Sequence, residues 1–242
     1  MPNFNHANVG TDQSVSEKIK KNMMLRIISA MVLAPLALAA VYSGGLFYQI
    51  LIGLMGLILI SEWFNIVGHR PKWLGLGVVY VALSVWALWR LRIDPEWGAM
   101  TVFWLVGVVW GADTGGYLFG MSIGGPKLAP AVSPKKTWSG FLGGTLMAAL
   151  AGWAVVSWYG SETDFEAAAL EIAAFSAAMA VVSQLGDLFE SWIKRRYNVK
   201  DSGWIIPGHG GLFDRVDGLM AVAIVVALIN IALQVNVLVW LS

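Results

Sequence analysis

The chain has no cysteine and only three histidines, so the usual ligands of a zinc centre are almost missing. Without thiols the protein can form neither a disulfide nor a thiolate metal site. Any metal site must then depend mainly on carboxylates. Carboxylate oxygens favour a hard cation such as Mg²⁺ over zinc.

Charged residues are scarce as well. They make up 13% of the chain, whereas a soluble domain usually carries about 25%. Hydrophobic residues make up 57%, and the mean hydropathy is +0.67. A chain this apolar cannot cover a surface that faces water, which excludes an ordinary soluble domain and requires a bilayer as solvent.

Seven apolar runs are long enough to cross a bilayer. They lie near residues 25–42, 46–67, 73–91, 98–119, 138–159, 165–191 and 217–241. In lipid, each run can satisfy its own backbone hydrogen bonds only as a helix. The sequence therefore predicts an all-α fold, a polytopic integral membrane bundle of about seven transmembrane helices. Residues 1–24 form a polar N-terminal tail, and residues 25–242 form a single transmembrane domain with loops near 120–137 and 192–216.

The basic residues indicate the orientation of this bundle. If the N-terminus is cytosolic and seven spans follow, all of the 16 lysines and arginines except Arg90 and Arg92 lie on the cytosolic side. The outer loops are acidic instead. Lysine and arginine accumulate in cytosolic loops, so the sequence predicts a cytosolic N-terminus and an outer C-terminus.

Ionisable groups inside membrane spans are costly and indicate function. Five carboxylates fall at or just below the predicted cytosolic face: Asp113, Asp187, Glu190, Asp214 and Asp217. The loops beside them are basic and rich in glycine. Carboxylates can hold Mg²⁺ while basic groups neutralise phosphate oxygens, so this arrangement suits a phosphate substrate bridged by a metal. Glu62, near another cytosolic span end, fits a structural hydrogen-bonding role and a site role equally well.

Spacing indicates which of these side chains share a helix face. Asp187, Glu190, Ser191 and Lys194 are three, four and seven residues apart, so we expect them on one face. Asp214 lies three residues before Asp217, and the two share a face if the last helix starts by residue 213.

Two loops offer candidate anion sites. The run Gly208-His209-Gly210-Gly211 allows backbone N–H groups to approach a phosphate, or it merely turns the chain. Ser133, Lys135 and Lys136 precede a predicted helix, where hydroxyls and ammonium groups favour anions. The two lysines fit equally well as positive anchors at the membrane. Glycines spaced as small-xxx-small between residues 111 and 144 predict close helix packing.

The segment from Ser191 to Asp217 resembles the signature of phosphatidate cytidylyltransferases, also called CDP-diacylglycerol synthases. The residues that carry the resemblance are Ser191-Trp192-Ile193-Lys194-Arg195, Lys200-Asp201, Gly203, Ile206-Pro207, His209-Gly210-Gly211-Leu212 and Asp214-Arg215-Val216-Asp217. The stretches 186–191 and 133–137 also resemble this family. The likeness extends from about residue 110 to the C-terminus.

The resemblance implies that CTP and phosphatidic acid react to give CDP-diacylglycerol and pyrophosphate, for phospholipid synthesis. It implies Mg²⁺, with a second cation left open, between Asp187 and Asp214, and we add Asp217 as a metal ligand. We assign Lys200, Arg215 and His209 to the phosphates as catalytic residues. The remaining substrate-binding candidates are Ser133, Lys135, Lys136, Asp113, Ser191, Lys194, Arg195, Gly210 and Gly211.

The expected partners are CTP, phosphatidic acid and the bilayer, with no nucleic acid, and a homodimer stays open. The expected location is a bacterial inner membrane, with the site facing the cytosol. Two alternatives remain: a CTP-dependent lipid-alcohol kinase, and a transporter with aspartates at its cytosolic face. We expect Asp187→Asn and Asp214→Asn to abolish turnover and leave the fold intact.

Overall fold

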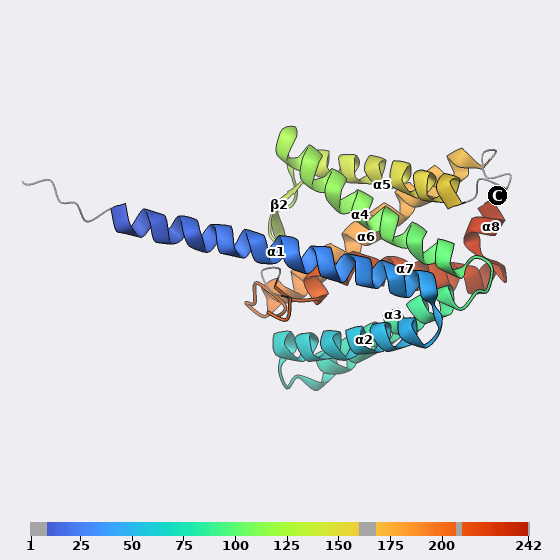
Figure 1. The fold of residues 1–242 in the computed structure, drawn as a ribbon, viewed down its shortest axis with the longest axis horizontal. Coiled ribbons are helices and arrows are strands. Elements are labelled where there is room, and N and C mark those ends of the chain that lie inside the picture. The colour runs from blue at the N-terminus through green and yellow to red at the C-terminus, as the bar shows by residue number, and fades with distance from the viewer. Residues whose placement is uncertain (1–8, 160–167, 207–209, 242) are drawn as a thin grey trace, which may run out of the picture.

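A computed structural model describes residues 9–159, 168–206 and 210–241, with side chains from Met23 onward. The described chain is a bundle of long helices that run up and down along one direction (Figure 1). These helices are α1 (Val9–Ser43), α2 (Gly45–Val67), α3 (Pro71–Arg92), α4 (Gly98–Ser122), α5 (Trp138–Tyr159), α6 (Ala169–Arg196) and α7 (Phe213–Leu233). A short helix, α8 (Val237–Leu241), follows.

Seven of the described helices are long and apolar enough to span a membrane, as the sequence predicts. The shortest spans have 21 residues. At 1.5 Å per residue, such a span is about 31 Å long, close to the hydrocarbon thickness of a bilayer. The chain is therefore a polytopic integral membrane protein.

Both ends of the chain differ in detail from the expected spans. Helix α1 begins at Val9, so it extends through much of the polar segment that precedes the first apolar run. At the other end α7 stops at Leu233, because Gln234 adopts a left-handed conformation with φ of 57°. The Asn230 side chain then accepts the N–H of Val237 at 2.9 Å, which starts α8 as a separate helix.

Helices α4 and α5 pack closely because glycines face the contact. A Cβ atom on Gly115 would lie 2.5 Å from the carbonyl oxygen of Gly143. A Cβ atom on Gly144 would lie 2.6 Å from the carbonyl oxygen of Ala112. Both neighbours are backbone atoms that cannot move aside, so the close helix packing predicted from the small-residue spacing is confirmed.

The loop between α4 and α5 contains a two-stranded antiparallel hairpin, which the sequence did not predict. Strands β1 (Lys127–Ala129) and β2 (Ser133–Thr137) pair with Lys127 opposite Thr137. The Thr137 hydroxyl accepts the N–H of Gly140 at 3.1 Å and so caps the start of α5. Along β2, Pro134 and Lys135 are exposed, Lys136 is half-buried and Thr137 is buried.

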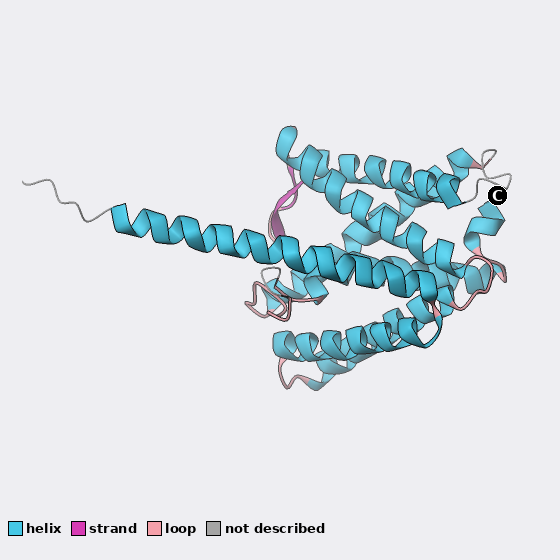
Figure 2. Cartoon of the chain, viewed as in Figure 1, coloured by secondary structure: helices cyan, strands magenta, loops and turns pink. Residues whose placement is uncertain are grey.

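The hairpin lies at the same end of the bundle as the loop between α6 and α7 (Figures 1 and 2). The connection between α2 and α3 is at this end too. We call it the basic end, since these loops and the helix ends beside them carry most of the lysines and arginines from Arg70 to Arg215. Successive loops thus lie at opposite ends of the bundle, as the predicted topology requires. The cytosolic orientation of the basic end stays a prediction.

Candidate functional site

Helix α6 presents four polar side chains on one face near the basic end, as their spacing predicts. The Ser191 hydroxyl donates to Asp187 Oδ1 at 3.2 Å. One turn farther, Lys194 Nζ lies 3.0 Å from Glu190 Oε2. Glu190 is buried and Lys194 is largely so, which means that α6 carries charges into the bundle where only specific partners can balance them.

Asp217 on α7 completes a group of three carboxylates. Ligand oxygens of Asp187, Glu190 and Asp217 all lie within 4.8 Å of one another. Glu190 Oε1 is buried and has no hydrogen-bond partner among the described residues. Negative charges this close repel one another unless a cation lies between them. These three carboxylates are therefore a group that could hold a metal ion, and they include two of the three ligands expected from the sequence.

The third expected ligand, Asp214, has a different environment. It forms an ion pair with Lys194, and its Oδ2 accepts backbone N–H groups from Ser202 at 3.2 Å and Gly211 at 3.3 Å. Asp214 thus lies outside the group of three carboxylates in this structure. Because Lys194 contacts both Glu190 and Asp214, it connects α6 to the start of α7.

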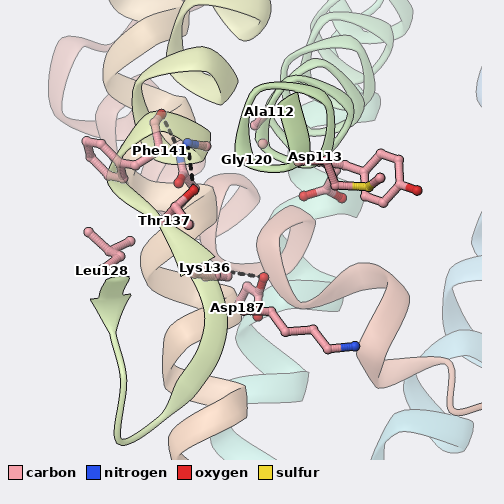
Figure 3. A pocket seen from close by; sticks show the side chains of 14 residues that line it. Ala112, Asp113, Gly120, Leu128, Lys136, Thr137, Phe141 and Asp187 are labelled. Carbon is pink, nitrogen blue, oxygen red and sulfur yellow. Dashed lines mark hydrogen bonds and ion pairs between the residues drawn. The ribbon is translucent and has the colours of Figure 1, made fainter. Parts of the chain in front are cut away.

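The hairpin and α6 meet at the site, although the sequence separates them by about 60 residues. Lys136 Nζ lies 2.6 Å from Asp187 Oδ2 (Figure 3). Arg195 Nε also donates to the carbonyl of Val132 at 3.3 Å. The structure thus places residues 133–136 beside α6 and the start of the signature segment, as expected from the sequence, while their sharing one substrate site stays a prediction.

A pocket of about 400 Å³ lies between the hairpin and helices α4, α5 and α6 (Figure 3). Its charged wall consists of Asp113, Lys135, Lys136 and Asp187. The volume is within the range of small-molecule sites in proteins. Both lysines whose role the sequence left open thus line this pocket. Lys136 directly contacts Asp187, one of the three carboxylates (Asp187, Glu190 and Asp217) that we call the acidic group.

A second cavity, of about 360 Å³, is an apolar groove between α1, α4 and α7. Leu33 of α1 and Val109 of α4 contribute to its apolar walls, and Asp113, Asp214 and Arg215 line its polar part. Helix α1 packs lightly, with 11% of its spanning segment buried against 33% or more in the other spans. Asp113 lines both cavities, so the polar pocket and the apolar groove meet at this side chain.

The other expected site residues are more scattered. Arg215 is exposed and lines the groove, and Ser133 begins strand β2. Lys200 is exposed in the loop after α6 and is not among the residues that line either cavity. Gly210 has a φ of 88°, which suits a turn, and His209 lies outside the described residues.

Glu62 is another residue whose role the sequence left open. It lies on α2, is fully buried and accepts three hydrogen bonds. The donors are the Ser202 hydroxyl at 3.1 Å, the Leu212 N–H at 2.9 Å and the Phe213 N–H at 2.8 Å. Glu62 therefore bonds the loop before α7 and does not join the acidic group. A glutamate inside an apolar run was the only signal for it in the sequence.

Comparison with known proteins agrees with this geometry. Residues 72–232 match the sequence model of the Cytidylyltransferase family, a range that includes all the acidic and basic groups of the two cavities. The chain is 36% identical to the phosphatidate cytidylyltransferase of Rickettsia bellii over 227 residues, which cover 91% of this chain and 96% of that protein. It is 36% identical to the same-named protein of Rickettsia conorii over 230 residues.

The match to the phosphatidate cytidylyltransferase of Brucella suis is shorter. It is 41% identical over 167 residues, which cover 69% of this chain and 58% of the Brucella protein. The matched region thus spans less than two thirds of that relative, whereas it spans nearly all of the Rickettsia proteins. Since the family match covers well over half of the chain, this protein belongs to the cytidylyltransferase family.

Proposed function

We propose that the protein transfers CMP from CTP to phosphatidic acid, which gives CDP-diacylglycerol and pyrophosphate. The observation that carries the proposal is the meeting of a charged pocket and an apolar groove at Asp113. An enzyme that joins a nucleotide to a lipid needs one cavity of each kind with a shared boundary. The names of the relatives from Rickettsia and Brucella support the same reaction.

A hard divalent cation fits the acidic group, and we assign Mg²⁺ to it. The donors are all carboxylate oxygens, which Mg²⁺ prefers, and Glu190 Oε1 is a buried acceptor without a described partner. Asp187, Glu190 and Asp217 would hold the ion, with Asp214 one turn away on α7. When bound, the metal neutralises negative charge on the CTP phosphates and on the departing pyrophosphate.

The lipid phosphate needs no protein base to become a nucleophile. A phosphate monoester has a second pKa of about 6, so it is mostly a dianion at neutral pH. One of its oxygens forms a bond to the α-phosphorus of CTP. The bond from that phosphorus to the oxygen of the β-phosphate breaks, and pyrophosphate leaves with the electron pair.

The chain's own residues position two anions that repel each other. Lys135 and Lys136 line the pocket where we place CTP, and their ammonium groups contact its phosphates. The groove between α1, α4 and α7 holds the acyl chains of phosphatidic acid, and Arg215 at its polar part contacts the lipid phosphate. The two phosphates then meet beside Asp113. Holding two reactants in line removes much of the entropic cost of their encounter.

The direct test is to incubate the purified protein with CTP, phosphatidic acid and Mg²⁺ and to identify the products. We expect CDP-diacylglycerol and pyrophosphate in equal amounts. A lipid-alcohol kinase would instead convert diacylglycerol and CTP to phosphatidic acid and CDP, and a transporter would form no product. The variant Glu171→Gln removes an exposed carboxylate from the far end of α6 and should retain full activity.

A further inference from the structure

A buried contact joins α2 to the loop that precedes α7. The Glu62 carboxylate accepts three hydrogen bonds, all from residues 140 to 151 positions later in the chain. Its Oε1 takes the N–H of Leu212, while its Oε2 takes the N–H of Phe213 and the hydroxyl of Ser202. Glu62 lies before residue 72, so the family match does not include it.

The contact explains why a carboxylate can be fully buried at this position. Burying a charged group is costly unless hydrogen bonds compensate for the lost water. Helix α7 begins at Phe213 with no side-chain cap from its own N-cap residue, Leu212. Glu62 supplies the missing acceptors, and its negative charge is favourable beside the positive end of the helix dipole.

The loop is shaped to let its backbone reach this carboxylate. A Cβ atom on Gly203 would lie 2.6 Å from Glu62 Oε1. A Cβ atom on Gly211 would lie 2.9 Å from Glu62 Oε2 and would collide with Ser202. The two glycines are therefore needed for packing against Glu62, whether or not they also approach a phosphate.

The same loop holds a carboxylate of the site. Ser202 donates its hydroxyl to Glu62 and its backbone N–H to Asp214 Oδ2, and Gly211 donates its N–H to that same oxygen. Asp214 in turn contacts Lys194, which contacts Glu190. A continuous series of hydrogen bonds and ion pairs thus runs from Glu62 to the acidic group.

We propose that Glu62 is a positioning residue, which acts through Ser202 and the first turn of α7 to hold Asp214 in its contact with Lys194 and to hold Asp217 in place for metal binding and cytidylyl transfer. It contacts neither cavity, so it does not touch the substrates. This inference rests on the proposed function for its link to turnover, whereas its link to metal binding can be measured separately.

The variant Glu62→Gln tests the proposal with almost no change in volume. The NH₂ group of glutamine can take the place of either carboxylate oxygen. In one orientation it faces the N–H of Leu212, and in the other it faces the N–H of Phe213. Two donors then face each other, and one backbone bond is lost. Losing a residue that orients metal ligands typically costs about 10- to 100-fold in metal affinity or activity.

We expect the Mn²⁺ dissociation constant, measured by electron paramagnetic resonance without substrates, to rise about 10- to 100-fold in Glu62→Gln. The Mg²⁺ concentration for half-maximal rate should rise in parallel. Hydrogen exchange should accelerate at the amides of Leu212 and Phe213. The control Glu171→Gln removes the same charge from an exposed position and should change none of the three measurements.

A folded Glu62→Gln protein that binds Mn²⁺ as tightly as the wild type would overturn the proposal and leave Glu62 a purely structural residue. If Glu62→Gln does not fold, Ser202→Ala provides the test, because it removes one bond to Glu62 and keeps the N–H that Asp214 accepts. It should weaken Mn²⁺ binding by a smaller factor, and unchanged binding would again overturn the proposal. A wild type that binds Mn²⁺ but forms no CDP-diacylglycerol would instead refute the proposed function.

Discussion

Replacing Asp187 with asparagine should abolish most of the activity and leave the fold almost unchanged. Asp187 Oδ2 contacts Lys136 at 2.6 Å, but the two side chains are 35% and 22% exposed. Ion pairs with this degree of exposure contribute about 1 kcal/mol or less to stability. Asparagine is nearly isosteric and keeps an oxygen that can accept the Ser191 hydroxyl. The fold should therefore lose very little.

The effect on the metal site is much larger. Ligand oxygens of Asp187, Glu190 and Asp217 lie within 4.8 Å of one another, and asparagine at position 187 removes one of their three negative charges. Removing one partner of a buried charge pair typically costs about 3–5 kcal/mol, and this range applies to Asp187 once the cation and CTP cover it. Since 1.36 kcal/mol corresponds to a factor of ten in rate, we expect turnover to fall by roughly 10²- to 10³-fold or more.

The assay measures initial rates of pyrophosphate release by purified Asp187→Asn, together with its melting temperature. A loss of about 1 kcal/mol should lower Tm by about 2–4 °C in a chain of this size. Lys136→Met breaks the same ion pair from the other side and should raise KM for CTP more than it lowers kcat. Near-normal turnover in a folded Asp187→Asn protein would remove Asp187 from the metal site.

Further predictions follow from other contacts. Asp214→Asn should reduce both activity and Tm, because an NH₂ group must face either Lys194 or two backbone N–H groups. These contacts correct the expectation from the sequence that this change leaves the fold intact, and an unchanged Tm would contradict the correction. Saturating Mg²⁺, at about 100 times its dissociation constant, should stabilise the wild type by about 2.7 kcal/mol, and Glu190→Gln should remove most of that gain in thermal unfolding. Gly115→Ala should destabilise the protein by about 1–3 kcal/mol, because its new methyl group meets backbone across the α4–α5 contact; wild-type stability would exclude that packing. A reporter fused after Ser242 should read as external, and a cytosolic signal would refute the orientation predicted from the basic residues.

The sequence alone determined the features that depend on local spacing and on the solvent. Seven spans and the alternation of loops follow from the lengths of the apolar runs, because lipid allows such segments to be only helical. The shared face of Asp187, Glu190, Ser191 and Lys194 follows from the helix period. Charges inside spans also indicated that Asp187 and Asp217 belong to a site, and the family resemblance implied that Asp187 is a metal ligand.

The tertiary structure decided which distant residues meet. It placed Glu190 beside Asp187 and Asp217, and it placed Asp214 against Lys194 and two backbone N–H groups, while a metal-binding role for Asp214 stays a prediction. It also placed Glu62 against a loop about 140 residues later. Neither result can be calculated from spacing, since each depends on how two helices rotate and slide when they pack. That rotation is set by the sum of many contacts along the whole bundle.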